Sequence, residues 1–120
     1  MSQPDDKQPP DPAVAQEERR AHPRHGAQVQ LELRQEGSDV PMRLATTDLS
    51  QNGCYVEMIA PLSVGVRVQA TLWLGEERVV VRGCVVTRHP QFGNGIMFLV
   101  FEDNGQQILR TFLAQLRTDN

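Results

Sequence analysis

The chain has few of the residues that mark several common classes of protein. Two cysteines occur among 120 residues, Cys54 and Cys84, and their spacing matches neither a zinc site nor a redox motif. We therefore expect both to be buried free thiols. No apolar run approaches the roughly 20 residues that span a bilayer, and the first residues lack the basic start and apolar core of a secretory signal. These absences predict a cytoplasmic protein without membrane insertion.

Aromatic residues and excess positive charge are also scarce. Aromatic residues make up 5% of the chain, and the formal net charge is −3. A small barrel that binds single-stranded nucleic acid should combine basic strands with exposed aromatic side chains. A general phosphate-backbone binder is normally basic as a domain. We therefore expect no nucleic-acid partner, although a barrel of that kind stays open as an alternative.

Patterns for catalysis and metal binding are missing as well. His22, His25 and His89 form no cluster with a carboxylate at a metal-ligand spacing, so we expect them in exposed loops. No pair of nucleophile and base stands out, so the sequence predicts neither an enzyme nor a cofactor.

The charge that is present is unevenly distributed. Residues 1–18 hold five acids and one base, whereas the remaining 102 residues hold ten acids and eleven arginines. Residues 1–12 are rich in Pro, Gln and Asp without apolar periodicity and cannot bury enough surface to offset the entropy of ordering. We predict a disordered acidic, Pro-rich tail over residues 1–18, one folded domain over residues 19–117, and a short tail over residues 118–120.

Strand patterns dominate from residue 28 onward. Apolar and polar residues alternate over 28–34, and further strands are predicted over 42–47, 54–59, 66–74, 78–88 and 96–101, with a hairpin at 75–77. Six antiparallel strands at short spacing, with little helix between them, predict a closed all-β barrel. Trp73 lies on the polar face of its strand, where we expect it to shield the barrel wall.

One helix is expected after the last strand. Asp103 is placed to cap it, with Gln106 three residues on. Its apolar stripe consists of Ile108, Leu109, Phe112, Leu113 and Leu116. The stripe should pack on the barrel, but it could instead join two chains, so a monomer or a weak dimer is expected.

Two short motifs stand out against this background. The first, Arg20 and Arg24 in an RxxxR spacing, should arise about once by chance in a chain with this many arginines, and the spacing recurs at residues 78–82. The second, Asp48, Ser50 and Gly53 in a DxSxxG spacing, should arise by chance only about 0.03 times. The second motif therefore carries most of the weight.

In order and spacing the two motifs resemble the signature of the PilZ domain, the bacterial receptor module for cyclic di-GMP. The resemblance covers roughly residues 19–117 and includes a late Gly-x-x-aromatic strand at residues 95–98. It implies a six-stranded antiparallel β-barrel with a carboxy-terminal helix, which agrees with the strand count above. It also implies cyclic di-GMP as ligand and signalling through a partner protein whose identity the sequence does not give.

The resemblance gives each motif residue a role that guanine chemistry supports. Arg20 and Arg24 would clamp guanine and phosphate, because a guanidinium offers a planar fork of donors. Asp48 would accept the guanine N–H groups, Ser50 would hydrogen-bond to ligand or backbone, and Gly53 would allow a positive φ or a close approach.

Two further arginines extend this expected site. Arg19, directly before the RxxxR pair, resembles the type of PilZ domain that binds a stacked pair of ligands, which implies two cyclic di-GMP molecules per chain. Arg88 is a weaker candidate contact, near a position where relatives often carry a basic or aromatic residue.

Two alternatives to ligand binding remain at this point. Asp48 and Ser50 can stabilise a turn while the arginines are solvated or pair with Glu17 and Glu18. The domain can also be a PilZ-like protein-interaction module that binds no nucleotide.

Overall fold

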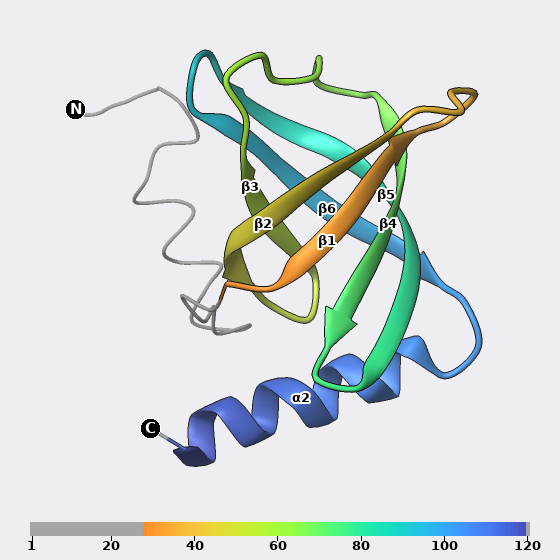
Figure 1. The fold of residues 1–120 in the computed structure, drawn as a ribbon, viewed down its shortest axis with the longest axis vertical. Coiled ribbons are helices and arrows are strands. Elements are labelled where there is room, and N and C mark those ends of the chain that lie inside the picture. Colours follow the sequence, from red (N-terminus) through yellow and green to blue (C-terminus); the bar gives the residue numbers. More distant parts are fainter. Residues whose placement is uncertain (1–27, 120) are drawn as a thin grey trace, which may run out of the picture.

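A computed structural model describes residues 28–119 and shows six strands wound into a barrel with one helix beneath it (Figure 1). The strands are β1 (Gln30–Gln35), β2 (Pro41–Leu49), β3 (Gly53–Glu57), β4 (Arg67–Leu74), β5 (Glu77–His89) and β6 (Gly93–Phe101). The helix, α2, spans Gly105–Asp119. The predicted six-stranded barrel with a carboxy-terminal helix is therefore confirmed.

The barrel is closed and antiparallel throughout. Its strands follow the order β1-β2-β3-β6-β5-β4, and β1 pairs with β4 to complete the ring. At this closure Leu31 pairs with Leu72 and Leu33 pairs with Ala70. All four side chains are buried, so the closure also forms one side of the core. The described strands therefore have no open sheet edge.

The core follows from the period-two alternation of the strands. Every second residue of β4 is buried, and the same pattern runs through most of β5. The buried apolar residues of the strands, with Val29 just before them, are Val29, Leu31, Leu33, Leu49, Cys54, Val56, Val68, Ala70, Leu72, Leu74, Val79, Val81, Val85, Ile96 and Phe98. They fill the barrel interior.

The helix α2 closes one end of this core. Leu109 and Leu113 are buried, and the other stripe residues, Ile108, Phe112 and Leu116, are partly buried against the core. The helix lies against one end of the barrel (Figure 1), and its predicted apolar stripe packs on the core. No helix within residues 28–119 is long and apolar enough to cross a membrane.

The start of α2 differs from the prediction by one residue. Asp103 has a φ of 54°, in the left-handed region, whereas a capping residue is usually extended. The first helical hydrogen bond runs from Ile108 N–H to the Asn104 carbonyl at 3.1 Å. Asn104 therefore occupies the cap position, and Asp103 makes the turn before it.

Several strand ends also lie beyond their predicted positions. β2 begins at Pro41, where a missing N–H costs little because it is the first residue of the strand. Asp48 is still in β2, although the whole motif was expected to form a turn. β6 begins at Gly93, and Glu77 pairs with Leu74, which leaves Gly75 and Glu76 as the hairpin loop.

Two further predictions need correction. Cys54 is buried as expected, but Cys84 is only half-buried on the outer wall, opposite Arg67. His89 is not in a loop: it is the last residue of β5 and is half-buried. Trp73 lies on the outer wall beside Arg78 and is 37% exposed.

Two buried polar side chains form hydrogen bonds to segments outside the strand pairing. Asn94 has no exposed surface; its Oδ1 accepts from Leu62 N–H at 2.8 Å, and its Nδ2 donates to the carbonyls of Leu62 at 2.9 Å and Thr87 at 3.1 Å. Thr46, also fully buried, accepts the Val29 N–H on its hydroxyl at 3.0 Å. Asn94 thus holds the β3–β4 connection, and Thr46 holds the chain where it enters the barrel.

Candidate functional site

The structure brings half of the predicted site together. Asp48, Ser50 and Gly53 lie around the hairpin that joins β2 to β3. Arg19, Arg20 and Arg24 lie outside the described residues, so their roles stay predictions.

A bulge in β2 turns Asp48 away from the core. The register with β3 shifts between Thr46 and Asp48, which pairs with Tyr55, so Thr47 is the extra residue. Without the bulge Asp48 would share the inward face of Thr46, because alternate residues of a strand share a face. With it, Leu49 is fully buried and Asp48 is half-buried on the outer wall. β2 therefore presents a carboxylate beside a tyrosine.

Ser50 closes the turn with its backbone and its side chain. Its N–H donates to the Gly53 carbonyl at 2.9 Å, its hydroxyl donates to the same oxygen at 3.4 Å, and the hydroxyl accepts the Asn52 N–H at 3.2 Å. The residue is 6% exposed. This is the hydroxyl-stabilised turn that serine favours. The described contacts of Ser50 thus support the turn, and a contact with ligand stays a prediction.

Gly53 is needed for a close approach of two strands. A Cβ on this residue would lie 2.2 Å from the Ile96 carbonyl oxygen of β6. Its φ is not in the left-handed region. Of the two reasons expected for glycine here, close approach applies and a positive φ does not. The approach allows β3 to pair with β6 directly after the turn, with Gly53 opposite Met97.

Tyr55 of β3 reaches across β6 to His89 of β5, a contact that the sequence analysis missed. Gly95 pairs with Tyr55, and Gly93 pairs with both Glu57 and His89, so β6 has no side chains between them. The Tyr55 hydroxyl lies 3.0 Å from His89 Nδ1, and the ring centroids are 5.8 Å apart. A Cβ on Gly93 would lie 3.0 Å from the tyrosine ring. The Gly-x-Gly spacing of Gly93 and Gly95 was the one sequence signal that a side chain could lie across β6 here.

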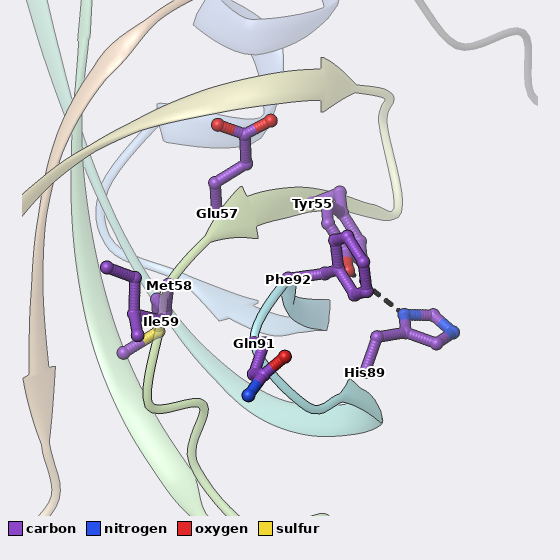
Figure 2. Close-up of a pocket in the computed structure, with 7 residues that line it drawn as sticks. All are labelled: Tyr55, Glu57, Met58, Ile59, His89, Gln91 and Phe92. Carbon is purple, nitrogen blue, oxygen red and sulfur yellow. Dashed lines mark hydrogen bonds between the residues drawn. The ribbon is translucent and has the colours of Figure 1, made fainter.

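An open pocket of about 750 Å³ lies beside the Tyr55–His89 pair (Figure 2). It is lined by the end of β3 and the β5–β6 turn, with Tyr55, Glu57, Met58, Ile59, His89, Gln91 and Phe92. Phe92 is 70% exposed and Ile59 is 85% exposed. Gln91 has a φ of 69°, in the left-handed region. The pocket therefore has apolar and aromatic walls and one carboxylate, Glu57.

The environment of Tyr55 favours its neutral form. Burial of the phenol raises the pKa of Tyr55 above its ordinary value, and the nearby Glu57 carboxylate raises it further. Near neutral pH the hydroxyl therefore keeps its proton, and it is available as a donor to His89 or to a bound molecule.

The weaker candidate, Arg88, lies one residue before His89. Its side chain is exposed, and its Nε donates to the Pro61 carbonyl at 3.4 Å. This bond links β5 to the β3–β4 connection. Within residues 28–119 no group of three or more His, Cys, Asp and Glu side chains is placed to hold a metal ion.

The wall formed by β2, β3 and β6 can bind a flat molecule that carries N–H donors. Asp48 offers acceptor oxygens, and the ring of Tyr55 offers an apolar face beside them. The arginines of the first motif could add positive charge for an anionic ligand.

Comparison with known structures gives the same fold. The chain resembles the PilZ domain of CeSA from a cellulose-synthesizing bacterium, with a TM-score of 0.63 and 19% identity over 78% of this chain and 97% of that one. It resembles the Bacillus subtilis inhibitor of motility MotI/DgrA, with a TM-score of 0.68 and 16% identity over 82% of this chain and 51% of that one.

A third similar structure is the PilZ domain of YcgR from Escherichia coli with c-di-GMP. Its TM-score is 0.56, with 14% identity over 84% of this chain and 96% of that one. A search of curated proteins found none that matches the chain. The family model for the PilZ domain matches residues 18–115. This match covers most of the chain, which therefore belongs to the PilZ domain family.

Proposed function

We propose that the protein binds cyclic di-GMP on the wall formed by β2, β3 and β6 and passes the signal to a partner protein. The observation that carries the proposal is the outward turn of Asp48 by the β2 bulge, next to the place where the chain enters the barrel. A carboxylate in this position can accept the N1 and N2 hydrogens of guanine. The YcgR domain, which has the same fold, was solved with c-di-GMP.

The distance from the barrel entry supports a role for the arginines. Val29 is fastened to Thr46, two residues before Asp48 on β2. Arg24 precedes Val29 by five residues, and five residues span at most about 18 Å. This length of chain would allow the guanidinium of Arg24 to reach a ligand held by Asp48, and Arg20 precedes Arg24 by four residues. In this proposal both arginines clamp the guanine and phosphate groups.

The other parts of the proposal follow from the same site. Arg19 adds a cation for a second ligand, so two cyclic di-GMP molecules bind per chain. Ser50 keeps the turn in place and Gly53 keeps β3 against β6. The protein acts in the cytoplasm, as a monomer or a weak dimer, and neither nucleic acid nor a cofactor takes part.

The test is isothermal titration calorimetry with cyclic di-GMP, GMP and cyclic di-AMP. Cyclic di-GMP should bind, and the other two should bind more weakly or not at all. Asp48→Ala should weaken binding by about 1.5 to 3 kcal/mol, the range for hydrogen bonds to charged groups. Asp39→Ala is the matched control, because Asp39 is an exposed carboxylate outside the candidate site.

Two results would contradict the proposal. If cyclic di-GMP gives no heat with the folded wild-type protein, the chain is an interaction module that binds no nucleotide. If Asp48→Ala binds like Asp39→Ala, the residue assignment is wrong even though the ligand is right.

A further inference from the structure

The outer wall of β5 and β6 carries large apolar side chains that the candidate site does not use. Val86, Met97 and Leu99 are each 43% exposed, and Val100 is 59% exposed. We name these four residues the β5–β6 patch. Contiguous exposed apolar side chains on a small soluble domain mark a surface that another molecule covers.

A bulge places two of these side chains outside together. Ile96 and Phe98 are buried, so regular alternation would also turn Val100 inward. The register between β5 and β6 shifts by one residue between the Phe98 and Val100 pairs, and Leu99 and Val100 are both exposed. The bulge therefore moves a valine from the core to the surface, next to a leucine.

Arginines border the patch on its β4 side. Val100 pairs with Arg82, Arg82 pairs with Gln69, and Gln69 pairs with Arg34, so these residues form one row across the sheet. In the next row Met97 pairs with Cys84, and Cys84 pairs with Arg67. Glu36, whose N–H donates to the Arg67 carbonyl, ends this row. The two rows hold three exposed arginines and one carboxylate. The surface is thus apolar on one side and positively charged on the other.

The closed barrel limits how a partner can bind here. All six strands have two neighbours, so a partner cannot add a strand to an open edge. It has to contact the side chains of the wall. A two-fold contact with a second copy would bring six of these arginines into one interface with two carboxylates, and like charges that face each other are unfavourable.

We propose that the β5–β6 patch, with Arg82 and Arg67, docks a segment of a partner protein that combines acidic and large apolar side chains. Its apolar side chains cover Met97, Leu99 and Val100, and its carboxylates pair with the two arginines. Arginine suits this role because its planar fork matches a carboxylate.

The strand β6, which carries most of the patch, is hydrogen-bonded to the β2–β3 turn. Met97 pairs with Gly53, and Phe98 N–H donates to the Asn52 carbonyl at 2.8 Å. A ligand that shifts this turn therefore shifts β6 at the patch. This coupling rests on the proposed function, whereas the docking surface itself does not.

The experiment places a photo-crosslinking amino acid at Leu99 in the full chain, in the cells that make it. An identical substitution at Arg43, exposed on the outer face of β2, is the control. Mass spectrometry then identifies the segment that is joined to residue 99. We expect a segment of another protein with net negative charge and at least two large apolar residues, and no such product from residue 43.

The identified segment is then synthesised and titrated against the wild type and charge variants. Arg82→Glu and Val100→Glu should each weaken binding at least tenfold, and Arg43→Glu should leave it unchanged. Thermal melting and a cyclic di-GMP titration of each variant show that the barrel and the other site are intact. If wild-type protein fails to bind cyclic di-GMP, the proposed function fails, and the crosslinking result is judged by itself.

The proposal is overturned by several specific results. These are a crosslink from residue 99 to residues 1–18 of the same chain, to a second copy, to a basic segment or to lipid, or no crosslink at all. Equal binding of the segment to the wild type and to both charge variants would also overturn it.

Discussion

At the scale of single residues, the DxSxxG motif combines an outward-turned carboxylate with two residues that support the backbone. Asp48 is turned to the outer wall, whereas the Ser50 hydroxyl supports the turn and Gly53 allows two strands to meet. The proposed recognition of guanine would account for the aspartate. The serine and glycine are explained by the turn and by the backbone of β6, so their substitution should be measured as stability before it is measured as binding.

Gly53→Ala should destabilise the fold by about 2 to 3 kcal/mol, the upper part of the range for an overpacked core. The added methyl group would meet the Ile96 carbonyl, which belongs to the β3–β6 ladder and cannot move alone. Gly37→Ala is the control: no atom lies within 4 Å of its Cβ position, but its φ of 87° should cost about 1 kcal/mol. Urea denaturation measures both, and equal midpoints would contradict the close approach.

Tyr55 gives a second prediction at this scale, because it is the single tyrosine of the chain. Burial and Glu57 raise its pKa, so the folded protein holds the phenol proton more tightly than the unfolded chain does. The resulting stabilisation is present below about pH 10, the unfolded pKa, and is lost as the pH rises through the higher folded pKa. Ultraviolet titration of the phenolate should therefore show a raised midpoint in buffer and an ordinary one in denaturant.

Glu57→Gln should lower that midpoint only in part, since burial is the larger cause. Glu36→Gln, which removes an exposed carboxylate from the turn after β1, should leave it unchanged. A midpoint in the folded wild type at or below that of the denatured protein would show that Tyr55 is not buried as described.

At the scale of elements, most strands could be predicted because their buried positions alternate. The β4 segment shows this clearly, with apolar residues at every second position and all of those within the strand buried. The bulge at Thr47 was not predictable, because a bulge depends on the partner strand and leaves no mark in the alternation of such a short segment. The direction of the Asp48 side chain was therefore unknown from the sequence, although the rarity of the DxSxxG spacing was enough to select the residue.

The role of the two β6 glycines beneath Tyr55 was missed for a related reason. The strand predicted from the alternation begins at residue 96 and leaves out Gly93 and Gly95, since glycine is rare in strand interiors. In the structure they belong to β6, where the lack of side chains lets a tyrosine lie across the strand. Only the pairing of β3, β6 and β5 reveals that use.

Asn94 provides the prediction that belongs to this scale. Its three hydrogen bonds fasten the β3–β4 connection to β5 and β6 from a fully buried position. Asn94→Ala should cost about 3 kcal/mol, because it removes three hydrogen bonds from partly buried backbone groups of Leu62 and Thr87. The Leu62 amide should also exchange with solvent much faster. Asn52→Ala, at an exposed position, should stay within about 0.5 kcal/mol of the wild type.

Hydrogen exchange separates a local from a global effect of Asn94→Ala. Faster exchange confined to the β3–β4 connection would show that the Asn94 hydrogen bonds stabilise this connection locally. Unchanged protection of the Leu62 amide, or unchanged stability, would contradict it.

At the scale of the whole molecule, the barrel and the three arginines of the proposed clamp occupy different parts of the sequence. All six strands, their closed ladder and the core lie within residues 28–119. The proposed clamp, Arg19, Arg20 and Arg24, precedes them in the sequence. The proposed function therefore divides along the chain into a scaffold that carries Asp48 and a preceding segment that supplies positive charge.

Two truncations test this division. Deletion of residues 1–18 removes the acidic segment and keeps all three arginines, so cyclic di-GMP should still bind, with two molecules per chain. Deletion of residues 1–27 should leave the barrel folded, with Trp73 fluorescence and the melting transition little changed, but should abolish measurable binding.

Arg19→Ala in the full chain should reduce the fitted ratio of ligand to protein from two to one, because the charge of the second ligand loses its partner. Binding by the barrel without residues 1–27, or a ratio of one in the wild type, would show that the arginines do not act in this way.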